Sequence, residues 1–376
     1  MRLIINASLN YIGGGLQVAL SFIQECIRME NHTYYVFASD NLFSQLTDKS
    51  FPNNFIFYRI PELKFYQYNS YLSKLERKIL PDVVFSIFSP VYWRPKSLHI
   101  AGFAMGHYLY PDSPLWRVVS WRYKSLWILK KYIHGIYLKR DIDVFIVETN
   151  DASSRLIQLY KKPCYVVSNT YSSDFDLFKK GRLEQKEILP NIKENEYRLL
   201  SVCSPYVHKN LSVIPSVIDR LNEKGYYNIK FVLTISEQIY LKLIPEKYRD
   251  VVFNVGTVSS ILLPQLYSEC DAVFVPSLLE CFTANFPEAM IMEKPILASD
   301  LSFAHSICDV AALYFDPMDS DDIADNIIKL YVTPEIEKQL INEGKKRVLS
   351  FKTAQERANS YIKICSETVN HNHVCI

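Results

Sequence analysis

Residues 272–290 read AVFVPSLLECFTANFPEAM and combine a strand, a turn and the start of a helix. The apolar run 272–275 is typical of a buried strand, and the apolar residues from Phe286 onward follow a helical pattern. Open α/β sheets bind ligands at such turns, where the first N–H groups of the helix can bind an anion. Glu280 and Glu288 would flank that anion, and carboxylates in this position suit sugar or ribose hydroxyls. The alternative is an ordinary helix entry with two solvated glutamates.

Length and composition restrict the class of protein. A chain of 376 residues exceeds one ordinary core, so we expect two domains. Hydrophobic residues make up 49% and aromatic residues 14%, which supplies ample core material. The net charge of +2 does not suggest a nucleic-acid-binding protein.

The cysteines and the N-terminus indicate a compartment. Eight cysteines occur without a Cys-x-x-Cys pair, which predicts buried free thiols in a reducing environment. The chain starts at once with the strand pattern Leu3–Asn6, so we expect neither a signal peptide nor a membrane span. The sequence thus predicts a cytoplasmic protein.

A glycine loop follows this first strand. Gly13, Gly14 and Gly15 precede a helical pattern, and glycines let a ligand approach the backbone closely. Val18 stands where the last glycine of the dinucleotide fingerprint would be, so that motif is absent. A phosphate- or carbohydrate-binding loop and a simple tight turn both remain open.

His107 lies in a loop with Gly and Pro, just after the expected strand 98–103. A histidine beyond the end of a strand is well placed to meet a substrate. A single histidine also often serves only the structure, and both interpretations remain.

The segment 115–140 has an unusual composition. Basic residues alternate with Trp and Tyr, and the segment contains no acidic residue. A single helix would place Arg117, Lys124 and Lys131 on one face and apolar residues largely on another. We expect this helix to bind the surface of an anionic membrane. The alternatives are a half-buried domain helix with a solvated basic face, and single-stranded nucleic-acid binding, which the balanced net charge disfavours.

The second half repeats the alternation of strands and helices. The polar stretch 172–196 has the composition of an interdomain linker, and a strand pattern begins at Tyr197. Lys209 would sit at a helix entry, where a cation and N–H groups together can hold a diphosphate. Three acids, Asp319, Asp321 and Asp322, are interpreted as capping the next helix.

At this point the chain resembles the retaining glycosyltransferases of family 4, which have the GT-B architecture of two Rossmann-like domains facing each other across a cleft. The resemblance is carried by residues 276–290, which match the Glu-x7-Glu signature. It is supported by HKNL at 208–211, LYSECD at 266–271 and AALYFDP at 311–317. The matching residues span most of the second half. The resemblance implies an α/β fold with an acceptor domain at 1–175, a donor domain at 176–352, and a C-terminal helix at 353–376 that packs on the first domain.

The resemblance also implies roles for single residues. Glu288 would accept hydrogen bonds from the ribose of a nucleotide sugar, and Glu280 would contact the donor sugar. Lys209 would neutralise the diphosphate leaving group without a metal, helped by N–H groups at 283–285. Ser204 occupies the position of an arginine common in the family. The predicted catalytic residues are Glu280, His107 and Lys209, and the predicted donor-binding residues are Lys209, Glu288, Glu280, Thr283, Ala284, Asn285, Ser204, Gly14 and Gly15.

The sequence therefore predicts a metal-independent retaining glycosyltransferase without a bound cofactor, whose donor substrate is a nucleotide sugar. Its acceptor would be a lipid-linked glycan of bacterial O-antigen or capsule. The protein would act in the cytoplasm at the inner face of the plasma membrane, and we expect no nucleic-acid partner. Two alternatives remain. One is a nucleotide-sugar epimerase or phosphorylase of the same fold, and the other is a non-catalytic partner protein.

Overall fold

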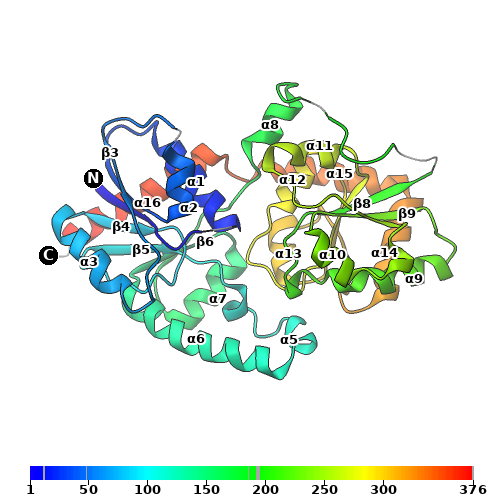
Figure 1. Ribbon diagram of the computed structural model, residues 1–376, viewed down its shortest axis with the longest axis horizontal. Coiled ribbons are helices and arrows are strands. Elements are labelled where there is room, and N and C mark those ends of the chain that lie inside the picture. Colours follow the sequence, from blue (N-terminus) through cyan, green and yellow to red (C-terminus); the bar gives the residue numbers. More distant parts are fainter. Residues whose placement is uncertain (12, 48, 185, 192–194, 375–376) are drawn as a thin grey trace. The chain divides into compact units, whose positions relative to one another are not determined.

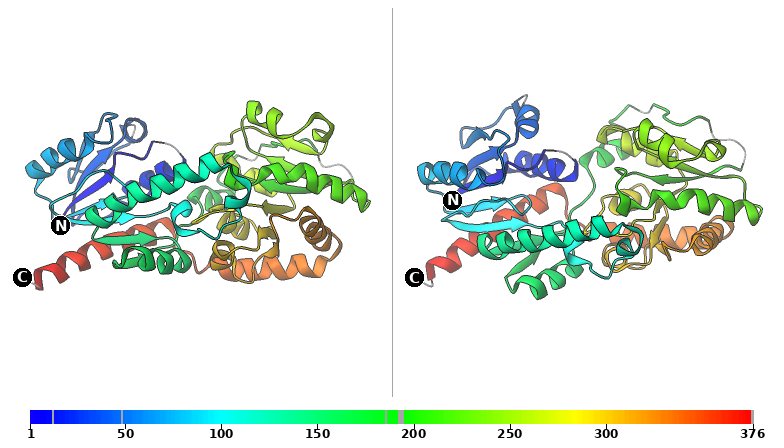
Figure 2. Two further views of the ribbon diagram at one scale, coloured as in Figure 1. Left: turned by 90° about the horizontal axis from the view of Figure 1, so that it is seen from below. Right: turned by 60° about the horizontal axis from the view of Figure 1, so that its bottom comes forward.

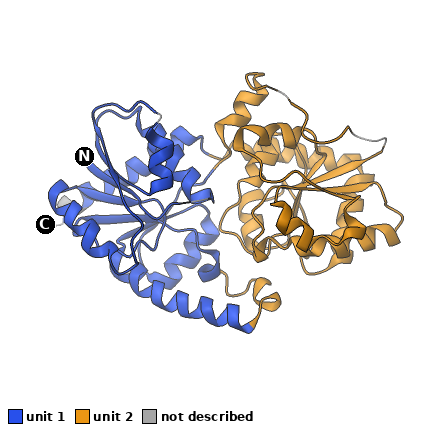
Figure 3. Cartoon of the chain, in the orientation of Figure 1, with its two compact units in different colours: residues 1–109, 121–169, 352–376 blue, residues 110–120, 170–351 orange. Residues whose placement is uncertain are grey.

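The computed structural model describes residues 1–11, 13–47, 49–184, 186–191 and 195–374. It contains two compact units (Figure 3). Unit 1 comprises Met1–Leu109, Trp121–Asn169 and Lys352–Ile376, and unit 2 comprises Tyr110–Ser120 and Thr170–Phe351. Residues 110–120 thus belong to unit 2, although the predicted first domain, 1–175, includes them. Among the described helices, none is long and apolar enough to cross a membrane.

Unit 1 contains a parallel sheet with the strand order β3-β2-β1-β4-β5-β6-β7 (Figure 1). Its strands are β1 (Arg2–Ala7), β2 (Thr33–Ala38), β3 (Phe55–Arg59), β4 (Val83–Ser86), β5 (Leu98–Gly102), β6 (Val144–Val147) and β7 (Cys164–Val166). The predicted strands at 3–6 and 98–103 correspond to β1 and β5, because buried parallel strands are nearly continuous apolar runs.

Helices cover both faces of this sheet. They are α1 (Gly13–Cys26), α2 (Asp40–Thr47), α3 (Tyr68–Ile79), α4 (Gly106–Leu109), α6 (Trp121–Asp141), α7 (Asn150–Tyr160) and α16 (Ala354–Val374). Along β1, Leu3 and Ile5 pack into a core with α1, α2 and α16, whereas Ile4 packs into a second core with α3. This alternation follows from the period of a strand, which turns successive side chains to opposite faces.

The prediction of a single helix over 115–140 is wrong, because this segment contains two helices. A short helix, α5 (Leu115–Val118), ends where Val119 is extended, and α6 begins at Trp121. Arg117 therefore does not share a helix with Lys124 and Lys131.

On α6, which runs along the outside of unit 1 in Figure 2, most of the exposed side chains are apolar or aromatic. Lys124 and Lys131 are half-buried, and the Lys131 ammonium donates to the Tyr108 carbonyl at 2.8 Å. Seven large apolar or aromatic side chains are instead 41% to 72% exposed. They are Trp121, Leu126, Ile128, Leu129, Tyr132, Ile133 and Ile136, and they are named the outer face of α6 below.

Unit 2 contains a second parallel sheet, in the order β10-β9-β8-β11-β12-β13. Its strands are β8 (Tyr197–Ser201), β9 (Ile229–Leu233), β10 (Val252–Asn254), β11 (Ala272–Val275), β12 (Ile296–Ser299) and β13 (Leu313–Phe315). Its helices are α5, α8 (Ser173–Lys179), α9 (Ile214–Glu223), α10 (Glu237–Leu243), α11 (Leu263–Ser268), α12 (Asn285–Ile291), α13 (Ser302–Cys308), α14 (Ser320–Val332) and α15 (Pro334–Val348), with 3-10 turns η1 (Val207–Lys209), η2 (Leu211–Val213), η3 (Glu246–Tyr248) and η4 (Ser260–Leu262).

The stretch 172–196 is more than a linker. It contains α8, in which Phe175 is fully buried and meets the ring of Tyr267 edge-on, with 5.5 Å between ring centroids. The polar composition of the stretch did not predict this helix. Burial of the single Phe175 ring stabilises α8 more than the solvated charged residues around it oppose its formation. Residues 185 and 192–194 of the stretch lie outside the described residues.

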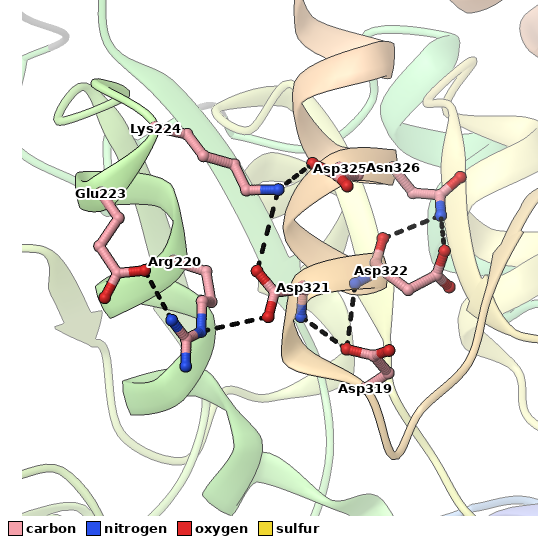
Figure 4. Close-up of polar contacts among 8 residues, drawn as sticks. All are labelled: Arg220, Glu223, Lys224, Asp319, Asp321, Asp322, Asp325 and Asn326. Atoms are coloured by element: carbon pink, nitrogen blue, oxygen red, sulfur yellow. Dashed lines mark hydrogen bonds and ion pairs between the residues drawn. The ribbon is translucent and has the colours of Figure 1, made fainter.

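The acids at the start of α14 act as predicted (Figure 4). The Asp319 carboxylate accepts hydrogen bonds from the backbone N–H groups of Asp321, at 2.9 Å, and Asp322, at 3.3 Å. Arg220 on α9 and Lys224, which directly follows this helix, form ion pairs with Asp321, at 3.4 Å and 3.9 Å. These pairs are exposed, so they contribute little to stability.

The described cysteines agree with the expected free thiols. Seven are free, and five of them are buried. The eighth, Cys375, lies outside the described residues.

Candidate functional site

Strand order explains why Lys209 and Glu280 meet. In unit 2 the first strand, β8, lies next to the fourth, β11. After β8 the chain adds β9 and β10 on one side of this pair, and after β11 it adds β12 and β13 on the other side. Both strands are parallel, and their carboxyl ends therefore open at the same edge. This switch point is where doubly wound sheets bind ligands. Lys209 follows β8, and the two glutamates follow β11.

Three hydrogen bonds join the two segments that meet at the switch point. Ser201 Oγ donates to the carbonyl of Phe274 at 2.6 Å. The Leu278 N–H donates to the carbonyl of His208 at 2.7 Å. The Asn285 amide donates to the carbonyl of Val202 at 2.6 Å. The position of each loop thus depends on the other.

Lys209 and Glu280 form an ion pair between the Nζ and Oε1 atoms. Their side chains are only 15% and 9% exposed. Burial by itself would lower the pKa of Lys209, but the charge and hydrogen bond of Glu280 more than offset it, so the pKa is raised. Lys209 therefore carries a firm positive charge at neutral pH, held in place beside a carboxylate.

Glu288 lies in the first turn of α12 and is buried. Its Oε2 atom accepts a 2.8 Å hydrogen bond from the hydroxyl of Tyr267, which is itself fully buried. Burial raises the pKa of Glu288 to about 7, although the Tyr267 hydrogen bond lowers it. A carboxyl group at this position changes its charge within the physiological pH range.

The remaining donor-binding candidates lie around these groups. Thr283 is buried, Ala284 is half-buried, and Asn285 is the first residue of α12. Ser204 is exposed in the loop between β8 and η1. Lys209 ends η1, and α9 begins only at Ile214, so the single helix expected after Lys209 is divided.

The N-terminal candidates all belong to unit 1. A Cβ atom at Gly15 would come within 2.8 Å of Asn10 Nδ2, so a larger residue there would require the Asn10 side chain to shift. At Gly14, by contrast, a Cβ atom would meet no described atom within 4 Å. His107 lies in α4, where its Nε2 is 2.8 Å from the Tyr123 hydroxyl and its ring stacks on Trp127, with centroids 3.7 Å apart.

Two features of the site escaped the sequence analysis. Tyr267 was part of the quoted motif but received no role, because no local spacing relates it to Glu288. Ser113 hydrogen-bonds the carbonyl of Leu278 at 2.6 Å, across 165 positions of sequence. Only a contact map could have revealed either interaction.

Comparison with known proteins finds similar sequences. Residues 184–347, which include Lys209, Glu280 and Glu288, match the family model described as Glycosyl transferases group 1. The O-antigen chain mannosyltransferase RfbU of Salmonella typhimurium is 27% identical over 218 residues, which are 56% of this chain and 54% of that relative. The chain thus matches about half the length of this relative. Residues 184–347 are thus similar to a glycosyltransferase family model, and part of the chain is similar to a mannosyltransferase.

Solved structures share the fold. Sucrose-phosphate synthase from Thermosynechococcus elongatus has a TM-score of 0.72 at 14% identity, covering 99% of this chain and 100% of that chain. HepE from Anabaena, in complex with UDP and glucose, has a TM-score of 0.68 at 14% identity, covering 98% and 100%. The two parallel sheets with their helices therefore have the predicted GT-B architecture.

Proposed function

We propose that this protein is a metal-independent, retaining glycosyltransferase of family 4. It would transfer a sugar from a nucleotide diphosphate donor to a glycan acceptor in the biosynthesis of a bacterial surface polysaccharide. The observation that carries the proposal is the buried Lys209–Glu280 pair at the switch point of unit 2, inside the region that matches the family model.

The chemistry of these side chains fits sugar transfer. When the bond between the anomeric carbon and the diphosphate breaks, the leaving group takes the electron pair and gains negative charge. Lys209 would neutralise that charge with little reorganisation, because Glu280 already holds its ammonium. Glu280 would also orient the hydroxyls of the donor sugar. Glu288 would accept hydrogen bonds from the ribose, and a same-face attack by the acceptor would retain the anomeric configuration.

A panel of nucleotide sugars tests the proposal by thermal shift. A true donor at about 100 times its dissociation constant should stabilise the protein by about 2.7 kcal/mol. Product analysis then separates the alternatives. An epimerase would convert the donor without any acceptor, and a phosphorylase would require free phosphate. EDTA should leave transfer unchanged. If no nucleotide sugar shifts the melting temperature, the proposed function is wrong.

The acceptor is proposed to be lipid-linked, and the outer face of α6 supports this part. Its apolar side chains would enter the headgroup region, and exposed Arg122 and Lys139 would attract anionic lipids. The opposite side of α6 is bound to the rest of unit 1 through His134. Its ring nitrogens lie 2.8 Å from the Tyr108 hydroxyl and 2.9 Å from the Tyr92 hydroxyl. A firmly tied helix with apolar residues outward suits a membrane surface better than water.

Vesicle co-sedimentation tests this surface. The protein should bind vesicles that contain phosphatidylglycerol more tightly than pure phosphatidylcholine, and added salt should weaken binding. Serine at Ile128, Leu129 and Tyr132 should lower binding at least about tenfold. A matched control is Tyr227→Ser, which removes a 66% exposed aromatic ring from unit 2. Unchanged vesicle binding of the triple variant would contradict the proposal. The proposal would also be contradicted if the parent protein is a dimer and the triple variant is a monomer, because the outer face of α6 would then be a dimer interface.

A further inference from the structure

Residues 110–120 form a segment of unit 2 between two segments of unit 1 (Figure 3). Ser113 fixes this segment, because its hydroxyl donates to the Leu278 carbonyl at 2.6 Å and accepts from the Leu115 N–H at 3.1 Å. Leu115 is fully buried, and the Trp116 indole donates to the Tyr110 carbonyl at 2.8 Å. The 110–120 segment is thus hydrogen-bonded to the loop that directly precedes Glu280.

A pocket of about 150 Å³ lies where this segment meets the loops after β11 and β12. Its lining comes from residues 110, 112–113, 278–279 and 300–303. The buried part of the lining is mainly apolar and includes Leu278, Leu279 and Phe303, together with Ser113, whose hydroxyl is bonded to the Leu278 carbonyl. The exposed part carries two carboxylates, Asp112 and Asp300.

Asp300 is held in a defined orientation. Its N–H donates to the Phe315 carbonyl on β13 at 2.7 Å. Its Oδ1 atom lies 2.6 Å from Nε2 of His305, and the His305 ring stacks on Tyr314 with centroids 3.8 Å apart. A side chain that is fixed in this way loses little entropy when it binds a ligand.

The lining selects one class of ligand. Two carboxylates repel phosphate and other anions, and they oppose the entry of an acyl chain. Carboxylates do accept hydrogen bonds from hydroxyls, and an apolar floor suits the C–H face of a sugar ring. The volume fits one monosaccharide unit. Leu279 precedes Glu280, so the pocket adjoins the residue proposed to contact the donor sugar.

We propose that this pocket binds the terminal neutral hexose of the acceptor glycan, with Asp112 and Asp300 accepting hydrogen bonds from its hydroxyls. The proposal rests on the proposed glycosyltransferase function and adds the acceptor subsite to it. His305 would be a positioning residue, which acts by orienting Asp300.

Saturation-transfer NMR with the full chain tests the subsite, using the methyl α-glycosides of mannose, glucose and galactose as probes. At least one probe should bind, and Asp112→Asn with Asp300→Asn should weaken it by about tenfold per carboxylate. The matched control is Asp325→Asn, which alters an exposed acid on α14. Equal binding by the double variant, or binding of no glycoside by the parent, would overturn the proposal.

The nucleotide-sugar thermal shift, measured on the same variants, separates this proposal from the proposed function. The double variant should keep the parent's shift, because its changed residues serve the acceptor. If the variant instead loses the nucleotide-sugar shift, the pocket holds the donor sugar and the acceptor assignment is wrong. Absence of a shift in every protein, parent included, would contradict the glycosyltransferase function itself.

Discussion

Replacement of Glu288 by glutamine is expected to make the protein more stable above pH 7 while weakening its binding of nucleotide sugars. The stability gain follows from burial, which raises the pKa of Glu288 from 4.5 to about 7 in the folded protein. Between these values the unfolded chain releases the proton and the folded protein keeps it. Stability therefore falls as the pH rises from 4.5 to 7, by up to about 3 kcal/mol for this group.

Glutamine at position 288 cannot ionise, so the variant should avoid this loss. Its carbonyl can still accept the Tyr267 hydrogen bond, but its buried amide N–H groups cost about 1–2 kcal/mol if they find no acceptor. Relative to the parent, we expect the free energy of unfolding of the variant to be higher by about 1–2 kcal/mol at about pH 8 and no higher at about pH 5. Chemical denaturation at both pH values measures it. An identical pH dependence in parent and variant would show that Glu288 does not titrate in this range.

The loss of binding has a different cause. An ionised carboxylate accepts hydrogen bonds from both ribose hydroxyls, whereas an amide presents donors to one of them. We expect nucleotide-sugar affinity to fall about 10- to 100-fold, since hydrogen bonds to charged groups contribute about 1.5–3 kcal/mol. In the parent, affinity should also weaken below about pH 7, as Glu288 takes up its proton.

Tyr267→Phe is the matched control for Glu288. It removes the hydrogen bond that lowers the pKa of Glu288, so the pH at which affinity weakens should move upward. A Glu288→Gln protein that binds nucleotide sugar as tightly as the parent would remove Glu288 from the donor site.

The Lys209→Met protein should lose about 100- to 1,000-fold in transfer rate, as expected when a preorganised group no longer stabilises the leaving group. It should also be less stable by about 3 kcal/mol, because Glu280 would keep a buried charge without its partner. Initial rates with saturating donor and urea denaturation give the two values.

A second substitution separates the two effects. Adding Glu280→Gln to Lys209→Met removes the unpaired charge, so stability should return while transfer stays low. The matched control is Lys224→Met, whose ammonium pairs with Asp325 on the surface (Figure 4) and should affect neither property. If the double variant recovers transfer along with stability, Lys209 only holds the fold, and its assigned catalytic role is wrong.

The strand series could be predicted because parallel strands that are buried on both faces read as short apolar runs, and each run is visible locally. For the same reason, the turn after β11 could be identified with its two glutamates. The structure adds that β8 and β11 are neighbours, which brings Lys209 to Glu280 across 71 positions. Strand order depends on long-range packing, and no local pattern encodes it.

The sequence by itself determined the alternation of strands and helices, the GT-B fold class and the residue types around the turn at 276–290. Only the tertiary structure decided which groups meet there, including Tyr267 with Glu288 and Ser113 with Leu278. It also decided which side of α6 is outward. Helical periodicity shows that residues share a face, but the packing of neighbouring elements determines whether that face meets the core or the solvent.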